Sequence, residues 1–149
     1  MTAALQVFIV TAQMAFQGAA MGIRGMNHFT VLARDLAASR AFYIDVLGFA
    51  EGPRPPFGFP GAWLYVNDAP VLHIVAGRAV PEPPAGVIDH IAFSASGLRG
   101  TVARLKEHKI AYELRRQPGH GSWQLFCHDP SGAKVELDFS SEEPAPEAD

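Results

Sequence analysis

Two parts of this chain resemble each other at a nearly constant spacing, and this internal repeat constrains the fold more than any other feature of the sequence. Asn27-His28-Phe29-Thr30-Val31 opens an extended run, and Asp89-His90-Ile91-Ala92-Phe93 opens a second one 62 residues later. Gly61-Ala62-Trp63-Leu64-Tyr65 and Gly121-Ser122-Trp123-Gln124-Leu125 match in the same way, 60 residues apart. A module of this size cannot bury a sufficient core alone, so we expect the two copies to share one.

Each copy continues from its first strand into a helix and then into three further strands. Asp35 is a favourable N-cap for the first helix, and Gly48 is a typical residue to end it. The last strands are expected over residues 71–76 and 134–139. The order strand–helix–strand–strand–strand, found twice, predicts an α+β fold of two tandem βαβββ modules. Their curved mixed sheets would surround a shared cavity, because helices occur only early in each copy.

We expect the modules to span residues 26–77 and 87–139 and to form one domain over residues 26–139. Residues 1–25 are an N-terminal extension whose first charge is Arg24. This stretch is too polar for a bilayer span, and it lacks the basic start of a signal peptide. We therefore expect a cytoplasmic protein without a membrane partner. Residues 140–149 are acidic and contain proline, which indicates a solvated, disordered tail.

Composition excludes several classes of function. The net charge of −3 gives no basic surface for nucleic acid, so no nucleic-acid partner is expected. The single cysteine, Cys127, excludes an internal disulfide framework and a zinc site built from several thiolates. Neither a Gly-x-Gly-x-x-Gly loop nor a Walker loop occurs, so nothing supports nucleotide binding.

Four side chains that can bind a metal ion fall at corresponding places of the repeat. His28 and His90 belong to the first strand of each copy, and His73 and Glu136 lie 63 residues apart in the last strands. Strand alternation places all four on the polar faces, opposite the apolar ones. A single histidine on a strand is usually a surface residue, but four such coincidences predict a site for one divalent ion. Three imidazoles and a carboxylate suit Zn, Ni, Fe, Co or Mn.

Other residues are candidates for contact with a substrate. Trp63 and Trp123 have the size of core aromatics, and we also expect both at the rim of the cavity. His120 lies on a Gly-rich loop that is able to close over a site, although such loops are more often mere connections. Glu136 is the only carboxylate of the metal-binding set, which makes it the candidate catalytic residue, as general base.

The sequence resembles the vicinal-oxygen-chelate superfamily, also called the glyoxalase/bleomycin-resistance/dioxygenase group. The resemblance implies a divalent metal in the concavity, a small-molecule substrate and a homodimer. In the family pattern His28, His90 and Glu136 match the usual ligand positions, and His73 matches the variable fourth one. Thr30 resembles the residue after Asn-His-Leu in fosfomycin-resistance thiol transferases, which makes it a candidate substrate contact. The matching segments are Asn27 to Thr30, Phe42 to Phe49, Gly61 to Leu64, Asp89 to Phe93, Asp129 to Gly132 and Val135 to Leu137.

The resemblance implies a metal-dependent enzyme for a small molecule with adjacent oxygens, acting as a glyoxalase-like lyase or isomerase through an enediolate or oxyanion. Leu32 stands where many glyoxalase I sequences carry an arginine, which argues against a glutathione adduct as substrate. Two alternatives stay open: a metal-free protein that sequesters a drug, and an Fe(II) dioxygenase of the extradiol type.

Overall fold

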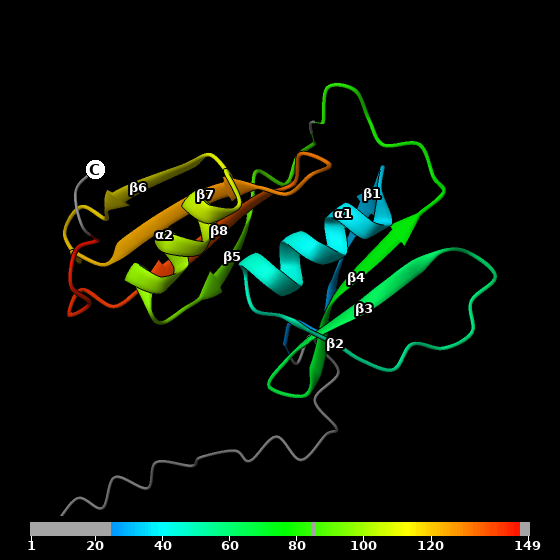
Figure 1. Cartoon of the computed structure of the whole chain (residues 1–149), viewed down its shortest axis with the longest axis horizontal. Coiled ribbons are helices and arrows are strands. Elements are labelled where there is room, and N and C mark those ends of the chain that lie inside the picture. Colours follow the sequence, from blue (N-terminus) through cyan, green and yellow to red (C-terminus); the bar gives the residue numbers. More distant parts are fainter. Residues whose placement is uncertain (1–24, 85, 147–149) are drawn as a thin grey trace, which may run out of the picture.

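The computed structural model describes residues 25–84 and 86–146, and in it each copy of the repeat forms its own four-stranded sheet (Figure 1). The sheets have the orders β1-β4-β3-β2 and β5-β8-β7-β6. This arrangement confirms the α+β class and the two βαβββ modules. The first module contains β1 (Phe29–Ala33), α1 (Leu36–Ala41), the π-helical η1 (Phe42–Val46), β2 (Ala50–Glu51), β3 (Gly61–Val66) and β4 (Ala69–Ala76). The second contains β5 (Ile91–Ser94), α2 (Leu98–Glu107), β6 (Tyr112–Arg116), β7 (Trp123–His128) and β8 (Lys134–Phe139).

The two sheets also agree in the pairing of their strands. β1 runs parallel to β4, and β5 runs parallel to β8, whereas the other neighbours are antiparallel. Thr30 pairs with His73 in the first sheet, and Ala92 pairs with Glu136 in the second. Thr30 and Ala92 each lie two residues after the histidine that directly precedes their strand. The two modules therefore share the order of their elements and also the register in which their first and last strands pair.

The first helix begins and ends where its sequence indicates. The Asp35 carboxylate accepts a hydrogen bond from the backbone N–H of Ala38 at 3.0 Å, which satisfies one of the free donors at the helix start. The chain leaves the helical region at Gly48, whose φ of +82° is a conformation that favours glycine. Between these points the helix widens into the π-helical turns of η1, which carry Phe42, Tyr43 and Val46 into the interior.

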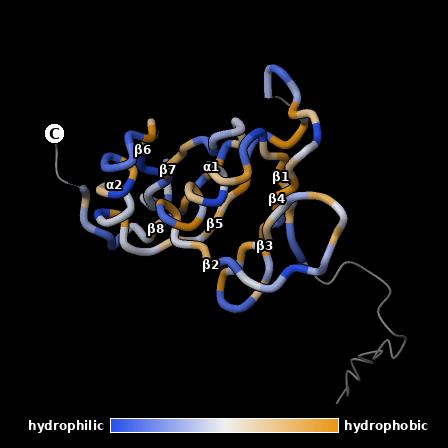
Figure 2. The backbone as a smooth tube through the Cα atoms, turned by 45° about the vertical axis from the view of Figure 1, so that its right-hand side comes forward, coloured by the Kyte–Doolittle hydropathy of each residue, from blue (hydrophilic) through white to orange (hydrophobic). Residues whose placement is uncertain are grey.

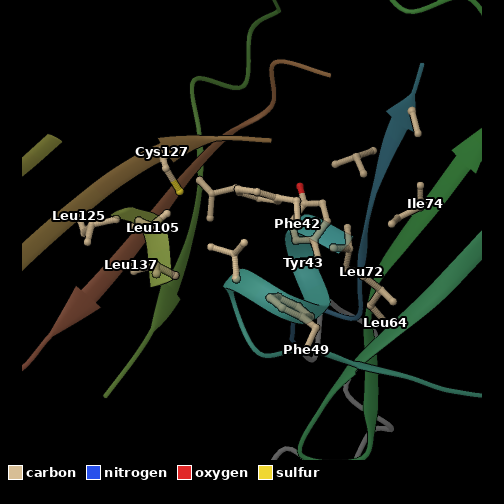
Figure 3. Packing of buried hydrophobic residues seen from close by; sticks show 14 of the residues in the cluster. Phe42, Tyr43, Phe49, Leu64, Leu72, Ile74, Leu105, Leu125, Cys127 and Leu137 are labelled. Atoms are coloured by element: carbon tan, nitrogen blue, oxygen red, sulfur yellow. The ribbon is translucent and has the colours of Figure 1, made fainter. Parts of the chain in front are cut away.

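One hydrophobic core joins the two modules. The apolar faces of both sheets and the buried sides of both helices belong to a single cluster, which Figure 3 shows with Phe42, Tyr43 and Phe49 between the two sheets. Phe93 of β5 lies against Phe29 and Phe49 of the first module, with ring centroids 5.5 and 5.3 Å apart. Figure 2 shows the hydrophobic stretches along β1 and β4. This cluster confirms the expectation that the two copies share a core.

A buried hydrogen bond crosses this core from the first module to the second. The Tyr43 hydroxyl donates to the Asp129 carboxylate over 3.1 Å, and neither residue is more than 4% exposed. The other Asp129 oxygen accepts the backbone N–H groups of Ser131 and Ala133, each at 2.8 Å. Burial, followed by the neighbouring Asp129, raises the pKa of Tyr43 far above its usual value, so Tyr43 stays a hydrogen-bond donor.

The described part of the C-terminal segment, residues 140–146, is exposed at most positions and is attached to the start of α2. Glu143 accepts hydrogen bonds from the backbone N–H groups of Gly97 and Leu98 at 2.8 and 2.7 Å, and so caps the start of α2. The reason is that Gly97 has no side chain to cap this helix itself. The predicted N-terminal extension lies outside the described residues except for its last residue. Among the helices of the described ranges, none has the length and apolar character that a membrane span requires.

We expect Tyr43→Phe to lower the free energy of unfolding by about 1–2 kcal/mol, because it removes a buried partner of Asp129 while both backbone donors remain. Urea denaturation measures the change. Tyr65→Phe is the matched control, since the Tyr65 hydroxyl donates to the Pro53 carbonyl at the surface and its loss should cost less than about 0.5 kcal/mol. Equal losses in the two variants would show that the Tyr43–Asp129 bond has no special role.

Candidate metal and substrate site

The first pair of predicted metal ligands lies on the polar face of the first sheet. His28 directly precedes β1, His73 lies in β4, and their rings stack with centroids 3.9 Å apart. On β3, Trp63 pairs in register with His73, and these two rings are nearly parallel with centroids 4.1 Å apart. The His73 imidazole therefore has two ring neighbours, His28 and Trp63.

His73 carries an unsatisfied polar atom. Its Nε2 atom is buried and has no hydrogen-bond partner among the described residues. Burial lowers the pKa of His73, and the nearby His28 lowers it further. The imidazole is therefore held in its neutral form, which is the form that binds metal ions. A buried nitrogen without a partner costs free energy, and this makes His73 Nε2 a candidate ligand atom.

The second pair lies at the corresponding place of the second sheet. His90 Nε2 is 2.6 Å from Glu136 Oε2, and Glu136 is only 4% exposed. The Gln124 side-chain amide donates to Glu136 Oε1 at 2.5 Å, so both carboxylate oxygens are positioned. The Asp89 carboxylate contacts His90 Nδ1 at 2.7 Å, and this hydrogen bond is the main cause that lowers the pKa of Asp89. An outer carboxylate of this kind orients a histidine so that Nε2 points inward.

The structure does not bring the two pairs together within one chain. Among the described residues no hydrogen bond, ion pair or ring contact joins His28 or His73 to His90 or Glu136, and no group of three or more potential ligands is assembled. The reason lies in the core. Because the modules meet through their apolar faces, with α1 and η1 between the sheets, each polar face lies on the side of its sheet away from this core (Figure 3).

A cavity of about 240 Å³ lies beside His73 on the polar face of the first sheet. Thr30 and Trp63, both predicted to contact a substrate, line it together with His73. The other side chains at its wall come from the loop between β2 and β3 and from the end of β4: Arg54, Phe57, Phe59 and Arg78. Sequence reasoning missed the two arginines, because neither belongs to the repeat. A larger cavity of about 420 Å³ touches none of the predicted ligands, so its size does not make it the candidate site.

Trp123 and His120 lie elsewhere. Trp123 pairs with Phe139 of β8, a core residue, and its indole N–H donates to the Glu143 carbonyl at 3.0 Å. The residue that corresponds to Trp63 in the second sheet is Phe126, which pairs with Glu136 as Trp63 pairs with His73. Relative to the neighbouring strand, the Gly-x-Trp segment of the second module is thus shifted by three residues. Because this number is odd, Trp123 lies on the opposite face of its sheet from the one that Trp63 occupies in the first sheet. His120 is exposed in the turn that follows β6, outside the cavity beside His73.

Comparisons with known proteins agree with this architecture. The family model of the Glyoxalase/Bleomycin resistance protein/Dioxygenase superfamily matches residues 25–137. The uncharacterized protein YaeR of Escherichia coli is 30% identical over 125 residues, which cover 78% of this chain and 97% of YaeR. Glyoxylase I 4 of Arabidopsis thaliana is 32% identical over 127 residues, covering 80% and 73%. A glyoxalase family protein from Bacillus anthracis shares the fold with a TM-score of 0.67 at 21% identity, covering 80% and 97%.

We expect His73→Phe to change the free energy of unfolding of the metal-free protein by less than about 1 kcal/mol, because it keeps the ring stack and removes an unsatisfied nitrogen. His73→Ala, which empties the stack, should cost at least about 2 kcal/mol. Urea denaturation in the presence of a chelator compares the two variants. A similar large loss in both would mean that the His73 nitrogens stabilise the fold without a metal.

Proposed function

Because its residues 25–137 match the family model, this chain belongs to the glyoxalase/bleomycin resistance/dioxygenase superfamily, and we propose that it is a metal-dependent enzyme for a small molecule with two adjacent oxygens. One observation carries the proposal. Two pairs of metal-binding side chains occupy equivalent register positions on the two sheets, and one of their nitrogens, His73 Nε2, is buried without a partner.

The donor set suits a divalent ion of the zinc or iron type. His28, His73, His90 and Glu136 offer three imidazoles and one carboxylate, which are ligands for Zn, Ni, Fe, Co and Mn. A bound ion would polarise the carbonyl of the substrate and stabilise negative charge on its oxygens. Three or four protein ligands are usual for such an ion, whereas each sheet supplies only two.

We propose that the complete site forms between two chains of a homodimer. The polar face of the first sheet in one chain would meet the polar face of the second sheet in the other. This pairing combines His28 and His73 with His90 and Glu136, and twofold symmetry produces two such sites for each dimer. The support is that the shared core directs the two polar faces of one chain away from each other.

Within the proposed site, different residues have different roles in proton transfer and in substrate binding. Glu136 is the proposed general base, and it would accept the substrate proton at Oε2 once its bond to the metal loosens; in the structure this atom lies 2.6 Å from His90 Nε2. Gln124 fixes the carboxylate through Oε1, so the orientation of Glu136 does not depend on the metal. Trp63 and Thr30 would hold the body of the substrate in the cavity beside His73 and exclude water from it.

We expect the purified protein to contain about one divalent ion per chain, and His28→Ala or Glu136→Ala to reduce this content by about tenfold because each removes a ligand. Elemental analysis measures the metal. His108→Ala is the matched control, since His108 lies at the end of α2 and belongs to neither pair. Equal metal content in all variants would rule out the proposed ligand set. A protein that never binds metal would support the alternative of a metal-free binding protein.

The same experiment tests the shared site when two different variants are combined. Chains with His73→Ala and chains with Glu136→Ala each lack a ligand in every site of their own homodimer. In a mixed dimer, one of the two shared sites receives both intact pairs. We expect mixed dimers, isolated by two different affinity tags, to recover about half of the wild-type metal content. No recovery would place all four ligands within one chain.

We further expect the protein to be a poor lyase for the methylglyoxal–glutathione hemithioacetal. Many glyoxalase I sequences carry an arginine for a glutathione carboxylate at the position of Leu32, and Leu32, on the polar face of β1, donates no hydrogen bond there. Arg34 does not replace it, because its guanidinium pairs with Glu82 at 2.5 Å. Thioester formation is followed with Zn, Ni, Co, Mn and Fe in turn. Efficient turnover that His90→Ala abolishes would contradict this expectation.

A further inference from the structure

Two arginines converge on the cavity beside His73, and both are held by the same aromatic ring. The Arg54 guanidinium lies 5.0 Å from the centroid of the Phe59 ring, and that of Arg78 lies 5.5 Å from it. Arg54 also lies 5.0 Å from the centroid of the Phe57 ring and donates to the Phe59 carbonyl at 2.9 Å. Arg54 therefore has a fixed direction, and only part of its hydrogen-bonding capacity is used.

No acidic side chain balances these two charges. The wall of the cavity contains no aspartate or glutamate, and within the described ranges neither Arg54 nor Arg78 forms an ion pair. Arg34, Arg40 and Arg115, by contrast, are each paired with a glutamate. The chain as a whole carries a net charge of −3, whereas the wall of this cavity has two positive side chains and no negative one. Two unpaired guanidinium groups in a partly enclosed site attract an anion.

We propose that Arg54 and Arg78 form a subsite for an oxyanion of the substrate, a carboxylate or a phosphate, attached to a planar apolar body that packs on Trp63. The inference rests on the proposed function, because it takes the cavity beside His73 as the substrate site. The same cavity is lined by both arginines and by His73. A small molecule in this cavity would therefore lie against both the arginines and His73.

The aromatic walls make the subsite selective. Trp63 is half-buried, and its indole stacks on His73, so it presents a flat surface at the wall of the cavity. A neutral molecule of the same shape gains this apolar contact but not the charge-assisted hydrogen bonds of the guanidinium groups. The substrate class is thus an anion with a planar body and adjacent oxygens.

The test measures binding to the metal-free protein, so that it does not depend on the metal site. In a Trp123→Phe background Trp63 is the only tryptophan, and its fluorescence reports on the cavity. Benzoate, phenylphosphonate and the neutral benzamide are titrated in the presence of a chelator. If Trp123→Phe fails to fold, isothermal titration calorimetry on the unmodified chain makes the same comparison.

We expect at least one of the two anions to bind about tenfold more tightly than benzamide, and the tighter one identifies the oxyanion as carboxylate or phosphonate. Arg78→Gln should weaken the binding of that anion about tenfold and leave benzamide unchanged. Arg99→Gln is the matched control, because Arg99 lies on α2 away from the cavity and should have no effect.

Equal affinity for the anions and benzamide, no binding of any probe, or no effect of Arg78→Gln overturns the subsite. Failure of the proposed function is recognised separately, by elemental analysis of the same preparation before the chelator is added. A protein without metal that binds an anion through Arg78 would disprove the metal-dependent enzyme and leave the subsite in place. A metal-containing protein without this anion preference would disprove only the subsite.

Discussion

The burial of one apolar face of each sheet in a common core is the constraint on which the rest of the structure depends. A module of this size is small for a core of its own, and α1 and η1 fill the space between the sheets and carry Phe42 and Tyr43 into it (Figure 3). The buried Tyr43–Asp129 hydrogen bond fixes how the modules meet, because a charged carboxylate inside a core needs every partner in place. The polar faces then necessarily lie outside this core.

The repeat gives two pairs of candidate ligands with the same backbone geometry but different chemistry. The stacked His28 and His73 are two imidazoles, of which His73 is held neutral by its burial. At the equivalent position the second sheet has His90 and the buried Glu136, whose carboxylate is oriented by Gln124. A duplicated fold can thus supply neutral ligands from one sheet, and charge together with a proton acceptor from the other. The proposed homodimer unites these two contributions in one site.

The modules differ in the loop between their second and third strands. In the first module residues 52–60 form a long excursion at the end of the molecule opposite the second module, where Figure 1 shows it beyond β3. This loop brings Arg54 and Phe59 to the cavity beside His73. In the second module the corresponding connection, residues 117–122, is shorter. In our proposals, the residues that select the substrate therefore belong to the first module, whereas the candidate metal ligands come from both.

The sequence by itself determined the order of the elements, the ends of the first helix at Asp35 and Gly48, and the polar face of each strand that carries a ligand. These features depend on capping, on the freedom of glycine and on the two-residue period of strands, all of which are local. Strand register is not local. The Gly-x-Trp pattern suggested that Trp63 and Trp123 are equivalent, but pairing with β4 and β8 makes Phe126 the counterpart of Trp63.

Only the tertiary structure decided where the two pairs of ligands lie relative to each other and which residues from outside the repeat join them. The separation of the pairs follows from packing the apolar faces against one another, which no short segment encodes. Arg54 and Arg78 are 24 positions apart in the sequence and belong to no motif. They meet because the loop 52–60 folds back over the end of β4, where both guanidinium groups pack on Phe59.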